Sequence, residues 1–442
     1  MSSEWSRVRI DEIGEVKSGK RLPLGHTLTD SPTDFPYIRL VDIADGRVSL
    51  NRLQFLRPET RVHIKRYVVN SNDVCLAIVG HTIGVVFYID KNLDDVNLTE
   101  NAARITAVKD LLNPKYLYYY FTSPVGQAEI QARKVGSAQG KLPLYNIKSL
   151  EILIPSRETQ DNVVALLDAL DNRITLLRET NATLEAIAQA LFKSWFVDFD
   201  PVRAKAEGLE PEGMDAATAA LFPDSFEESE LGLVPMGWRM LPLEDAYEIN
   251  PKRKLKKGEM ASYLDMASVG TQGHVVSGVV EREMGSGTKF INGDTLLARI
   301  TPCLENGKSA FVDFLSVDQT CWGSTEFVVL RPRAPLPPYH GYLLARHSAF
   351  REHAIQSMSG TSGRQRVQND VLGRYSVVVP SEEVAETFGA VVGSVQQNIA
   401  ASQKQAKTLT QLRDTLLPRL ISGQLRLPET EASIENMLSE AV

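Results

Sequence analysis

Cysteines and long apolar runs are scarce in this chain of 442 residues. It has only three cysteines, Cys75, Cys303 and Cys321, and no Cys-x-x-Cys pair. This pattern argues against a disulfide framework and against a cysteine zinc site, so we expect three buried thiols. No window holds about 18 consecutive apolar residues, and the first residues form neither a basic nor an apolar signal region. We therefore expect a soluble cytoplasmic protein.

Catalytic and metal-binding motifs are also missing. The seven histidines form no His-x-His or His-Glu-x-x-His pair, which are spacings typical of metal sites. Two loops resemble phosphate loops but fail at a required position. Leu142 stands where Ser or Thr would reach magnesium, and Pro302 stands where the first glycine belongs. The sequence predicts no catalytic residue, no metal and no cofactor on this chain.

The net charge of −7 comes from two short regions. Residues 206–230 hold eight acids and no base, and residues 427–442 hold four acids and no base. Without them the chain has 48 basic against 43 acidic residues and is mildly basic. The overall charge therefore does not exclude a DNA partner.

The chain contains an internal repeat, the first feature to look for in a sequence of this length. The segment that starts at Trp5 returns at Trp238, residues 72–78 return as 293–300, and residues 150–155 return as 375–380. The offset drifts between 221 and 233, as insertions in loops would cause. The sequence predicts two copies of one globular α/β (α+β) module.

A long helical segment with a heptad period follows each copy. Apolar residues recur at alternating spacings of three and four, which predicts the seam of a coiled coil. From residue 163 to residue 195 the first seam would be about 48 Å long at 1.5 Å per residue, too long to lie on one module. We therefore expect the two helices to pair antiparallel, giving a pseudo-twofold protein. The seam residues are Val163, Leu167, Leu170, Ile174, Leu177, Leu184 and Leu191 in the first helix, and Phe388, Val392, Val395, Ile399, Leu409 and Leu416 in the second.

Polar residues interrupt both seams. Asn181, Ser402 and Arg413 fall at seam positions. Such residues can penalise wrong registers, or they can mark a helix end or a subunit contact, and the sequence favours neither interpretation. Pro418 predicts that the second helix ends near Leu417.

Basic loops recur in both copies. Residues 252–257 hold five positive charges, and Lys17, Lys20 and Arg21 stand at the equivalent place of the first copy. Residues 130–150 contain no acid, and their counterpart, residues 359–369, holds Arg364 and Arg366. One basic loop is usually solvated surface. Recurrence in both copies favours contact with duplex DNA, because Lys and Arg neutralise phosphates, and Arg, Gln and Asn can bind base edges.

The ordered, duplicated set of segments resembles the specificity (S) subunits of type I restriction-modification systems, often called HsdS. The resemblance covers essentially the whole chain. It rests on residues 5–20, on Pro-Tyr-Ile-Arg-Leu-Val-Asp-Ile at 36–43, and on Asn-Asp-Val-Cys-Leu-Ala and Gly-Asp-Thr-Leu-Leu-Ala. It also rests on the segments that end at Pro155 and Pro380 and on the helix ends at 191–196 and 416–423.

The resemblance implies a DNA-recognition subunit without catalytic activity. Two target recognition domains, residues 1–155 and 238–380, would each read one half of a bipartite double-stranded DNA target. Conserved helices at 156–200 and 381–425 would form a coiled coil that sets the spacer. An acidic linker at 201–237, expected to be poorly regular, and an acidic tail at 426–442 complete the predicted domains.

The resemblance also implies the partners. Two methyltransferase (M) subunits would hold S-adenosylmethionine and methylate adenine, and two restriction (R) subunits would use ATP and Mg and cut DNA. No membrane partner is expected. By position, the first half-site would contact Lys17, Lys20, Arg21, Ser137, Gln139 and Lys141. The second half-site would contact Lys252, Arg253, Lys254, Ser362, Arg364, Gln365 and Arg366. Two alternatives are a coiled-coil adaptor that binds only proteins and a stand-alone DNA-modifying enzyme.

Overall fold

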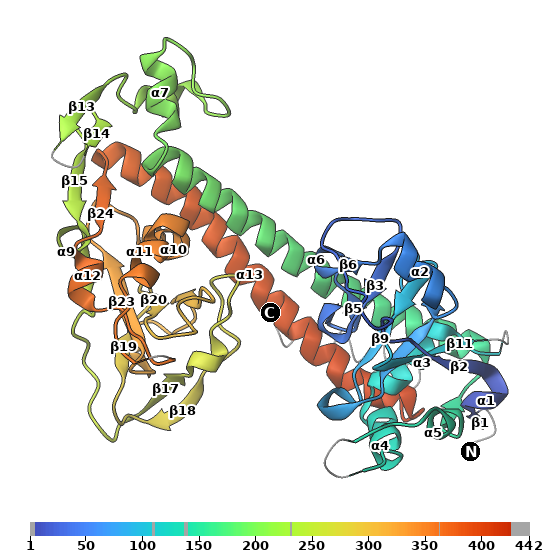
Figure 1. Cartoon of the computed structure of the whole chain (residues 1–442). Helices are drawn as coiled ribbons and strands as arrows, with labels where there is room; N and C mark the ends of the chain where they lie inside the picture. The colour runs from blue at the N-terminus through green and yellow to red at the C-terminus, as the bar shows by residue number, and fades with distance from the viewer. Residues whose placement is uncertain (1–4, 108–110, 137–139, 230–231, 362, 426–442) are drawn as a thin grey trace. The chain divides into compact units, whose positions relative to one another are not determined.

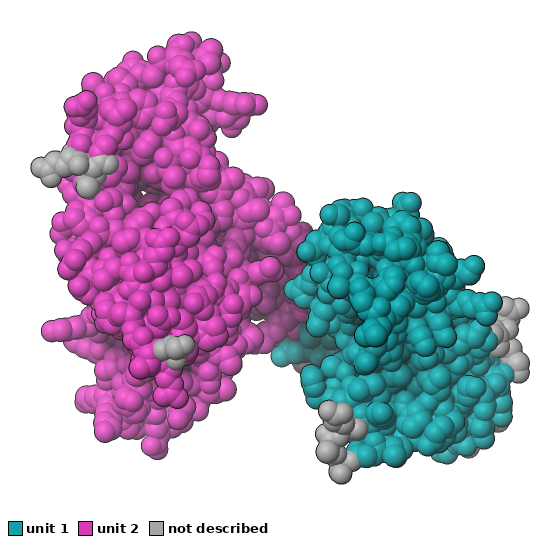
Figure 2. All heavy atoms as spheres, in the orientation of Figure 1, with its two compact units in different colours: residues 1–174, 408–442 teal, residues 175–407 magenta. Residues whose placement is uncertain are grey.

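The computed structural model describes residues 5–107, 111–136, 140–229, 232–361 and 363–425. The predictions for Ser137, Gln139, Ser362 and the tail lie outside the described residues. The chain divides into two compact units, coloured separately in Figure 2. Unit 1 comprises residues 1–174 and 408–442, and unit 2 comprises residues 175–407. This division runs through both long helices, whereas the predicted domains place each helix outside the modules.

The described residues of unit 1 form two four-stranded sheets and two two-stranded sheets. In the first sheet the order is β2 (Gly14–Ser18), β11 (Ala102–Ala107), β8 (Val74–Ala77) and β9 (Val86–Tyr88). In the second it is β6 (Gln54–Phe55), β3 (Pro36–Ile38), β10 (Val96–Leu98) and β7 (Val68–Val69), with β3 and β10 parallel. One two-stranded sheet pairs β1 (Ser6–Arg9) with β12 (Glu151–Ile154), and the other pairs β4 (Ile43–Ala44) with β5 (Arg47–Val48).

Unit 2 repeats the two four-stranded sheets and the sheet of β1 and β12, with equivalent strands in the same order. The first is β16 (Tyr247–Ile249), β23 (Phe327–Pro332), β20 (Thr295–Ala298) and β21 (Ser309–Phe311). The second is β18 (Val280–Glu283), β17 (Met260–Leu264), β22 (Cys321–Gly323) and β19 (Thr288–Phe290), again with one parallel pair, β17 and β22. β15 (Arg239–Pro242) pairs with β24 (Ser376–Val379). The predicted duplication of one mixed module is therefore confirmed.

Short helices also occur in matching places. In unit 1 they are α1 (Ile10–Ile13), α3 (Pro114–Thr122), α4 (Pro124–Ala132) and α5 (Leu144–Lys148), together with α2 (Pro58–Ile64). Their unit 2 counterparts are α9 (Leu243–Ala246), α10 (Pro338–Arg346), α11 (Ser348–Gln356) and α12 (Asn369–Gly373). α3, α4 and α10 begin with proline, whose fixed φ and missing N–H suit the first helical turn. Asn113 caps α3 by accepting from the N–H groups of Lys115 and Tyr116.

Two long helices, α6 (Arg157–Phe196) and α13 (Glu382–Ile421), follow the modules and contact each other (Figure 1). In unit 1 Asp171 of α6 pairs with Arg413 of α13. In unit 2 Asn181 donates to the carbonyl of Ile399, and Trp195 packs on Phe388. In unit 2 the residue numbers rise along α6 from Asn181 to Trp195 as those of their partners fall along α13 from Ile399 to Phe388, so the two helix segments of this unit are antiparallel.

The helices also complete the module cores. The main core of unit 1 includes Val164 of α6 and Leu417 of α13, and that of unit 2 includes Phe192 and Phe196. None of these four belongs to the predicted seam, because a helix that packs on both a partner and a module buries a wider stripe. Of the predicted seam residues, Leu184, Leu191, Val395 and Leu409 are half-buried and the others are buried.

The polar seam residues lie inside the helices and not at their ends. Arg413 donates to Asp171 (Nη1 to Oδ1, 2.8 Å) and to Asp414, and these bonds outweigh burial and raise the pKa of its guanidinium. Asn181 donates to the carbonyl of Ile399 at 3.3 Å. In both units a polar seam residue therefore makes a specific contact to the other helix. Of the two sequence interpretations, the helix-end alternative does not hold.

Three further expectations need correction. α13 continues through Pro418 to Ile421, because the proline lies in the last turn and the residues around it, Leu416, Leu417, Leu420 and Ile421, are buried. Cys303 is half-buried, while Cys75 and Cys321 are buried as expected. The linker is more regular than predicted, since it contains α7 (Asp200–Ala206), α8 (Ala216–Ala220) and a hairpin of β13 (Phe226–Ser229) and β14 (Gly232–Pro235). Within the described ranges, no helix has the length and apolar character to cross a membrane.

Candidate nucleic-acid interface

Several predicted basic residues of unit 1 gather at one end of the first sheet. β2 ends, β11 begins and β8 ends at this edge, because Ser18 pairs with Ala103, and Ala77 pairs with Ala102. The loop after β2 carries Lys20 and Arg21. Lys141 joins the same edge, because it forms bridges with Val135 and with Val79, which follows β8. The sheet thus brings together two loops that are 120 residues apart in sequence.

Unit 2 anchors the equivalent loop in the same way. Arg366 bridges Ile300, which follows β20, as Lys141 bridges Val79. The N–H of Thr301 donates to the carbonyl of Gln365 at 3.0 Å, and its unit 1 counterpart runs from Gly80 to Gly140 at 2.8 Å. The sequence repeat had matched these loops only by their basic character. The backbone bonds now match them residue by residue.

An acidic residue holds one arginine at each sheet end. Arg21 donates to Glu100 (Nε to Oε1, 2.8 Å), and Arg366 donates to Glu326 through two bonds of 2.8 and 2.6 Å. The hydrogen bond and the charge of Arg366 lower the pKa of the Glu326 carboxyl. Burial favours a raised pKa at Glu100, but hydrogen bonds, led by that from Arg21, lower it overall. Both carboxylates are thereby kept charged, and each accepts from one of the two guanidinium groups.

Arg253 departs from the predicted arrangement. Its side chain is only 15% exposed and donates to Asp294 (Nη2 to Oδ1, 2.8 Å), which also accepts from Arg331 at 2.7 Å. Asp294 precedes β20, whereas Ile300 and its bridge to Arg366 follow it. The two places are separated by roughly 20 Å at about 3.3 Å per residue of strand. The structure therefore does not bring Arg253 to the loop of Arg364–Arg366.

The early turn at Asn250 explains this placement. Its φ is +52°, and its side chain accepts from the N–H of Val329, so the chain leaves the sheet just after β16. In unit 1 the chain continues along β11 as far as Gly19, whose N–H donates to Ala102. Asparagine adopts this left-handed conformation more readily than most residues. The basic segment of unit 2 consequently starts about two residues earlier than that of unit 1.

The remaining predicted residues lie on the surface to different degrees. Lys17 pairs with Glu15 of its own strand, and the ammonium of Lys20 lies 5.5 Å from the ring centre of Tyr67. Gln365 is half-buried. The side chains of the others are exposed: Lys141, Lys252, Lys254 and Arg364.

Sequence reasoning overlooked Arg299. It follows β20 directly, its N–H donates to the carbonyl of Glu326, and its Nη2 lies 3.3 Å from Oε1 of Gln368. Its Nε is buried and has no hydrogen-bond partner among the described residues. Arg299 thus lies at the same sheet end as Arg366. Arg299 lies in a strand-like segment of the repeat and was therefore not assigned to DNA contact. The matching residue of the first copy is Ile78, and this change from an apolar to a basic residue is the signal that could have identified Arg299.

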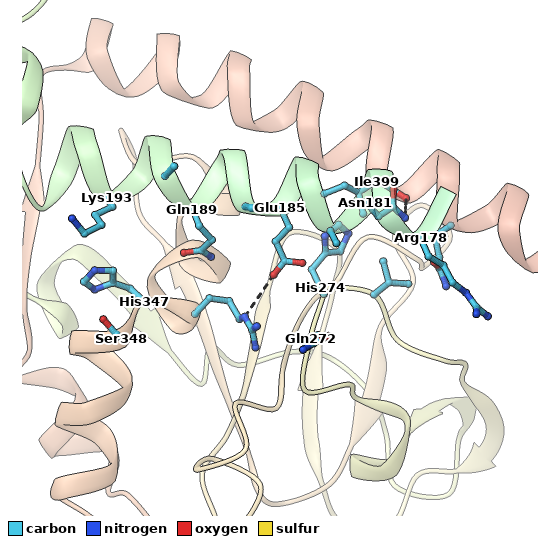
Figure 3. Close-up of a pocket in the computed structure, with 17 residues that line it drawn as sticks. Arg178, Asn181, Glu185, Gln189, Lys193, Gln272, His274, His347, Ser348 and Ile399 are labelled. Atoms are coloured by element: carbon cyan, nitrogen blue, oxygen red, sulfur yellow. Dashed lines mark hydrogen bonds and ion pairs between the residues drawn. The ribbon is translucent and has the colours of Figure 1, made fainter. Parts of the chain in front are cut away.

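Polar contacts fasten the long helices to the modules. In unit 1 the hydroxyl of Tyr119 lies within hydrogen-bonding distance of the carboxylates of Asp168 and Asp171 of α6, at 2.9 and 2.8 Å. In unit 2 Tyr342 donates to the buried Glu185 of α6 at 2.6 Å, and Arg346 lies 3.6 Å from the same carboxylate. Glu185 and Arg346 line a cavity of about 910 Å³, and Figure 3 shows Glu185 pointing from α6 toward the module. Each helix segment is therefore fixed in direction relative to the module of its own unit.

No metal site accompanies these features in the part of the chain that the structure describes, where no group of three or more His, Cys, Asp or Glu side chains could hold an ion.

Comparison with known proteins identifies relatives along the chain. A family model described as the type I restriction modification DNA specificity domain matches residues 2–186. The specificity subunit of the type I restriction enzyme HindI of Haemophilus influenzae is 24% identical over 418 residues, which cover 81% of this chain and 87% of that protein. The MjaIX specificity subunit of Methanocaldococcus jannaschii is 23% identical over 445 residues and covers 96% and 94%.

The fold is also shared with a solved structure. The crystal structure of a type I restriction-modification S subunit from M. genitalium matches with a TM-score of 0.56 and 17% identity, over 95% of this chain and 97% of that one. The resemblance inferred from the repeated segments is thus confirmed by sequence relatives and by fold. Along most of its length the chain is therefore similar to the specificity subunits of type I restriction-modification systems.

Proposed function

We propose that this chain is the non-catalytic DNA-recognition subunit of a type I restriction-modification complex, and that each unit reads one half of a bipartite target. One observation carries the proposal. The same loop is anchored by the same backbone bonds at the same sheet end of both modules, and it presents Lys141 in one copy and Arg364–Arg366 in the other. Two similar basic surfaces on one chain suit a target with two separate halves.

The paired helices are proposed to set the distance between the half-sites. A spacer of fixed length requires each module to be fixed on its helix segment. Tyr119 with Asp168 and Asp171, and Tyr342 with Glu185, provide such attachment. The contacts of Arg413 with Asp171 and of Asn181 with Ile399 would hold the helices in one register.

The finer assignments follow from the family. We infer that the chain directs adenine methylation by two M subunits that carry S-adenosylmethionine, and cleavage by two R subunits that use ATP and Mg. In this arrangement the chain recognises the target sequence, and the M and R subunits carry out methylation and cleavage.

Methylation sequencing of cells tests the proposal directly. Cells that carry this gene with a cognate methyltransferase gene are compared with cells that lack only this gene. We expect a split adenine motif that appears only when the chain is present. Identical methylation in both cells would refute the recognition role.

Lengthening the helices tests the ruler. Seven residues are inserted after Ile174 in α6 and seven after Lys407 in α13, which preserves the seam and adds about 10 Å. The recognised spacer should then lengthen by about three base pairs at 3.4 Å each. Insertion in one helix alone is the matched control and should abolish methylation, because it breaks the pairing. An unchanged spacer after the double insertion contradicts a ruler.

A further inference from the structure

Unit 1 has an open groove beside Trp5. A cavity of about 620 Å³ lies between the start of β1, the first turns of α6 and the end of α13. Trp5, Pro155, Val163, Leu420 and Leu425 provide its apolar walls. Trp5 is half-buried, and its indole lies against Gly423, which has a φ of +71° and leaves no room for a Cβ. The groove is therefore shaped around the tryptophan.

The internal repeat identifies the equivalent place in unit 2. Trp5 corresponds to Trp238, Val163 to Phe388 and Leu420 to Trp195, through the repeat offsets of 233 and 225. There the site is filled. Phe222 of the linker packs edge-on against Trp195 with ring centres 4.9 Å apart, and it lies 6.1 Å from the ring of Trp238. Phe222 and Trp238 are 2% and 4% exposed.

The occupant in unit 2 comes from an acidic segment that follows a long helix. Phe222 belongs to residues 206–230, the stretch with eight acids and no base, and Lys205 donates to its carbonyl. The second long helix is also followed by an acidic stretch without a base, residues 427–442. That stretch contains the large apolar residues Leu427, Ile434, Met437, Leu438 and Val442. In both copies, therefore, a long helix is followed by an acidic segment that contains apolar residues.

Continuity of the chain places this second segment next to the groove. Leu425 lines the cavity itself, and its N–H donates to the carbonyl of Arg419 at 3.1 Å. The chain therefore leaves α13 at the edge of the groove.

We propose that the groove beside Trp5 is a docking site for apolar side chains of residues 427–442 of the same chain, as Phe222 occupies the equivalent site of unit 2. The contact is apolar, so it excludes water from the indole and depends little on salt. Docking ties the segment after α13 to β1 and to the first turns of α6. This fastens the start of the first module to both helices.

Tryptophan quenching in the full-length chain tests the docking. Trp195, Trp238 and Trp322 are 5%, 4% and 3% exposed, so acrylamide quenching in the folded protein reports on Trp5. Truncation after Leu425 should make one further tryptophan of the four accessible and shift the emission to the red. In a Trp5→Phe background the same truncation should change nothing. Unchanged quenching after truncation, with circular dichroism confirming the fold, overturns the proposal.

Point variants separate side-chain docking from loss of the segment. Met437→Asp combined with Leu438→Asp should reproduce the effect of truncation. Ser433→Asp combined with Ser439→Asp adds the same charge to polar positions nearby and should leave quenching unchanged. An equal effect of both pairs would mean that charge and not apolar contact is responsible, which contradicts the proposal.

Crosslinking identifies the molecule that supplies the segment. Asn162→Cys places a thiol at the groove and Met437→Cys places one in the segment, in a Cys303→Ser background because Cys303 is half-buried. We expect a disulfide within one chain, at a rate independent of protein concentration. A crosslink that forms only between two chains, and slows on dilution, assigns the groove to a second copy and overturns docking within the chain.

Discussion

The two units share a strand order but stabilise the start of the central strand differently. In unit 1 the buried Asp73 accepts from Arg104 and Thr106 of the neighbouring strand β11. In unit 2 the buried Asp294 accepts from Arg331 of β23 and from Arg253, which comes from the basic segment after β16. The equivalent aspartate therefore accepts from a loop arginine in unit 2 but not in unit 1. A basic residue that aligns with a surface residue of the other copy can therefore be part of the core.

Neutralising Asp294 should have the largest effect. Asp294→Asn leaves the guanidinium groups of Arg253 and Arg331 without their carboxylate, and we expect the free energy of unfolding of unit 2 to fall by about 3 kcal/mol. Urea unfolding followed by fluorescence measures the change. Arg253→Ala should cost less, because Asp294 keeps Arg331, and it should leave the salt dependence of DNA binding unchanged. A reduced salt slope for Arg253→Ala would return this arginine to the DNA surface.

Changes in the equivalent loops should affect one half-site each. Arg364→Ala in unit 2 should reduce discrimination at one half of the target by about 2 kcal/mol, roughly thirtyfold, and leave the other half intact. Lys141→Ala in unit 1 should alter binding through the other half only. Competition binding with DNAs mutated in one half measures both effects. Arg374→Ala, which removes an exposed charge elsewhere in unit 2, is the control. Equal losses at both halves would contradict the interpretation that each unit recognises one half of the target.

Mild acid should destabilise unit 2 more than unit 1. His340 of α10 is fully buried, contacts the hydroxyl of Tyr247, and burial lowers its pKa to about 3. Its counterpart in α3 is Tyr116, whose pKa burial raises. Between pH 6.5 and 3 the unfolded chain binds a proton at this histidine and the folded chain does not. The contribution of the neutral, buried histidine is therefore complete above pH 6.5 and is lost as the pH falls.

A pH of 5.5 lies one unit below the ordinary pKa of histidine. At this pH we expect the free energy of unfolding of unit 2 to be lower than at neutral pH by about 1.4 kcal/mol because of His340. Calorimetry at pH 7 and pH 5.5 measures the loss. His340→Asn should be less stable at neutral pH but should flatten the pH dependence. A pH dependence that survives in this variant would assign the effect to another group.

The smallest effect is expected from the acids at the sheet ends. Glu100→Gln and Glu326→Gln each remove a negative charge beside the candidate DNA surface and release Arg21 or Arg366. We expect a slightly higher affinity for DNA at low salt, and a slope of log affinity against log salt steeper by up to about 0.9 for each variant. Titrations at several salt concentrations measure this slope. A weaker affinity would mean that these acids hold the arginines in their binding orientation.

Much of the fold could be predicted because it depends on repeated local patterns. Heptad spacing alone predicts that α6 and α13 pair, and the recurrence of strand-like segments predicts two copies of one module. Loop conformation could not be predicted in this way. The turn at Asn250 moves Arg253 to Asp294, and no periodic pattern encodes a single residue with φ of +52°. The end of α13 was also misplaced, since burial of Leu420 and Ile421 offsets the interruption by Pro418.

The sequence by itself therefore determined the duplication, the paired helices and the loops that carry basic residues. These features follow from the spacing of apolar and charged residues, and spacing is visible in one dimension. Only the tertiary structure decided which basic residues are available to a partner and which serve the core. It also showed that Phe222 fills one tryptophan site, whereas at Trp5 no described side chain takes the equivalent place. The physical reason is that burial and charge pairing depend on neighbours distant in sequence, such as Arg253 and Asp294, which only the folded chain brings within hydrogen-bonding distance.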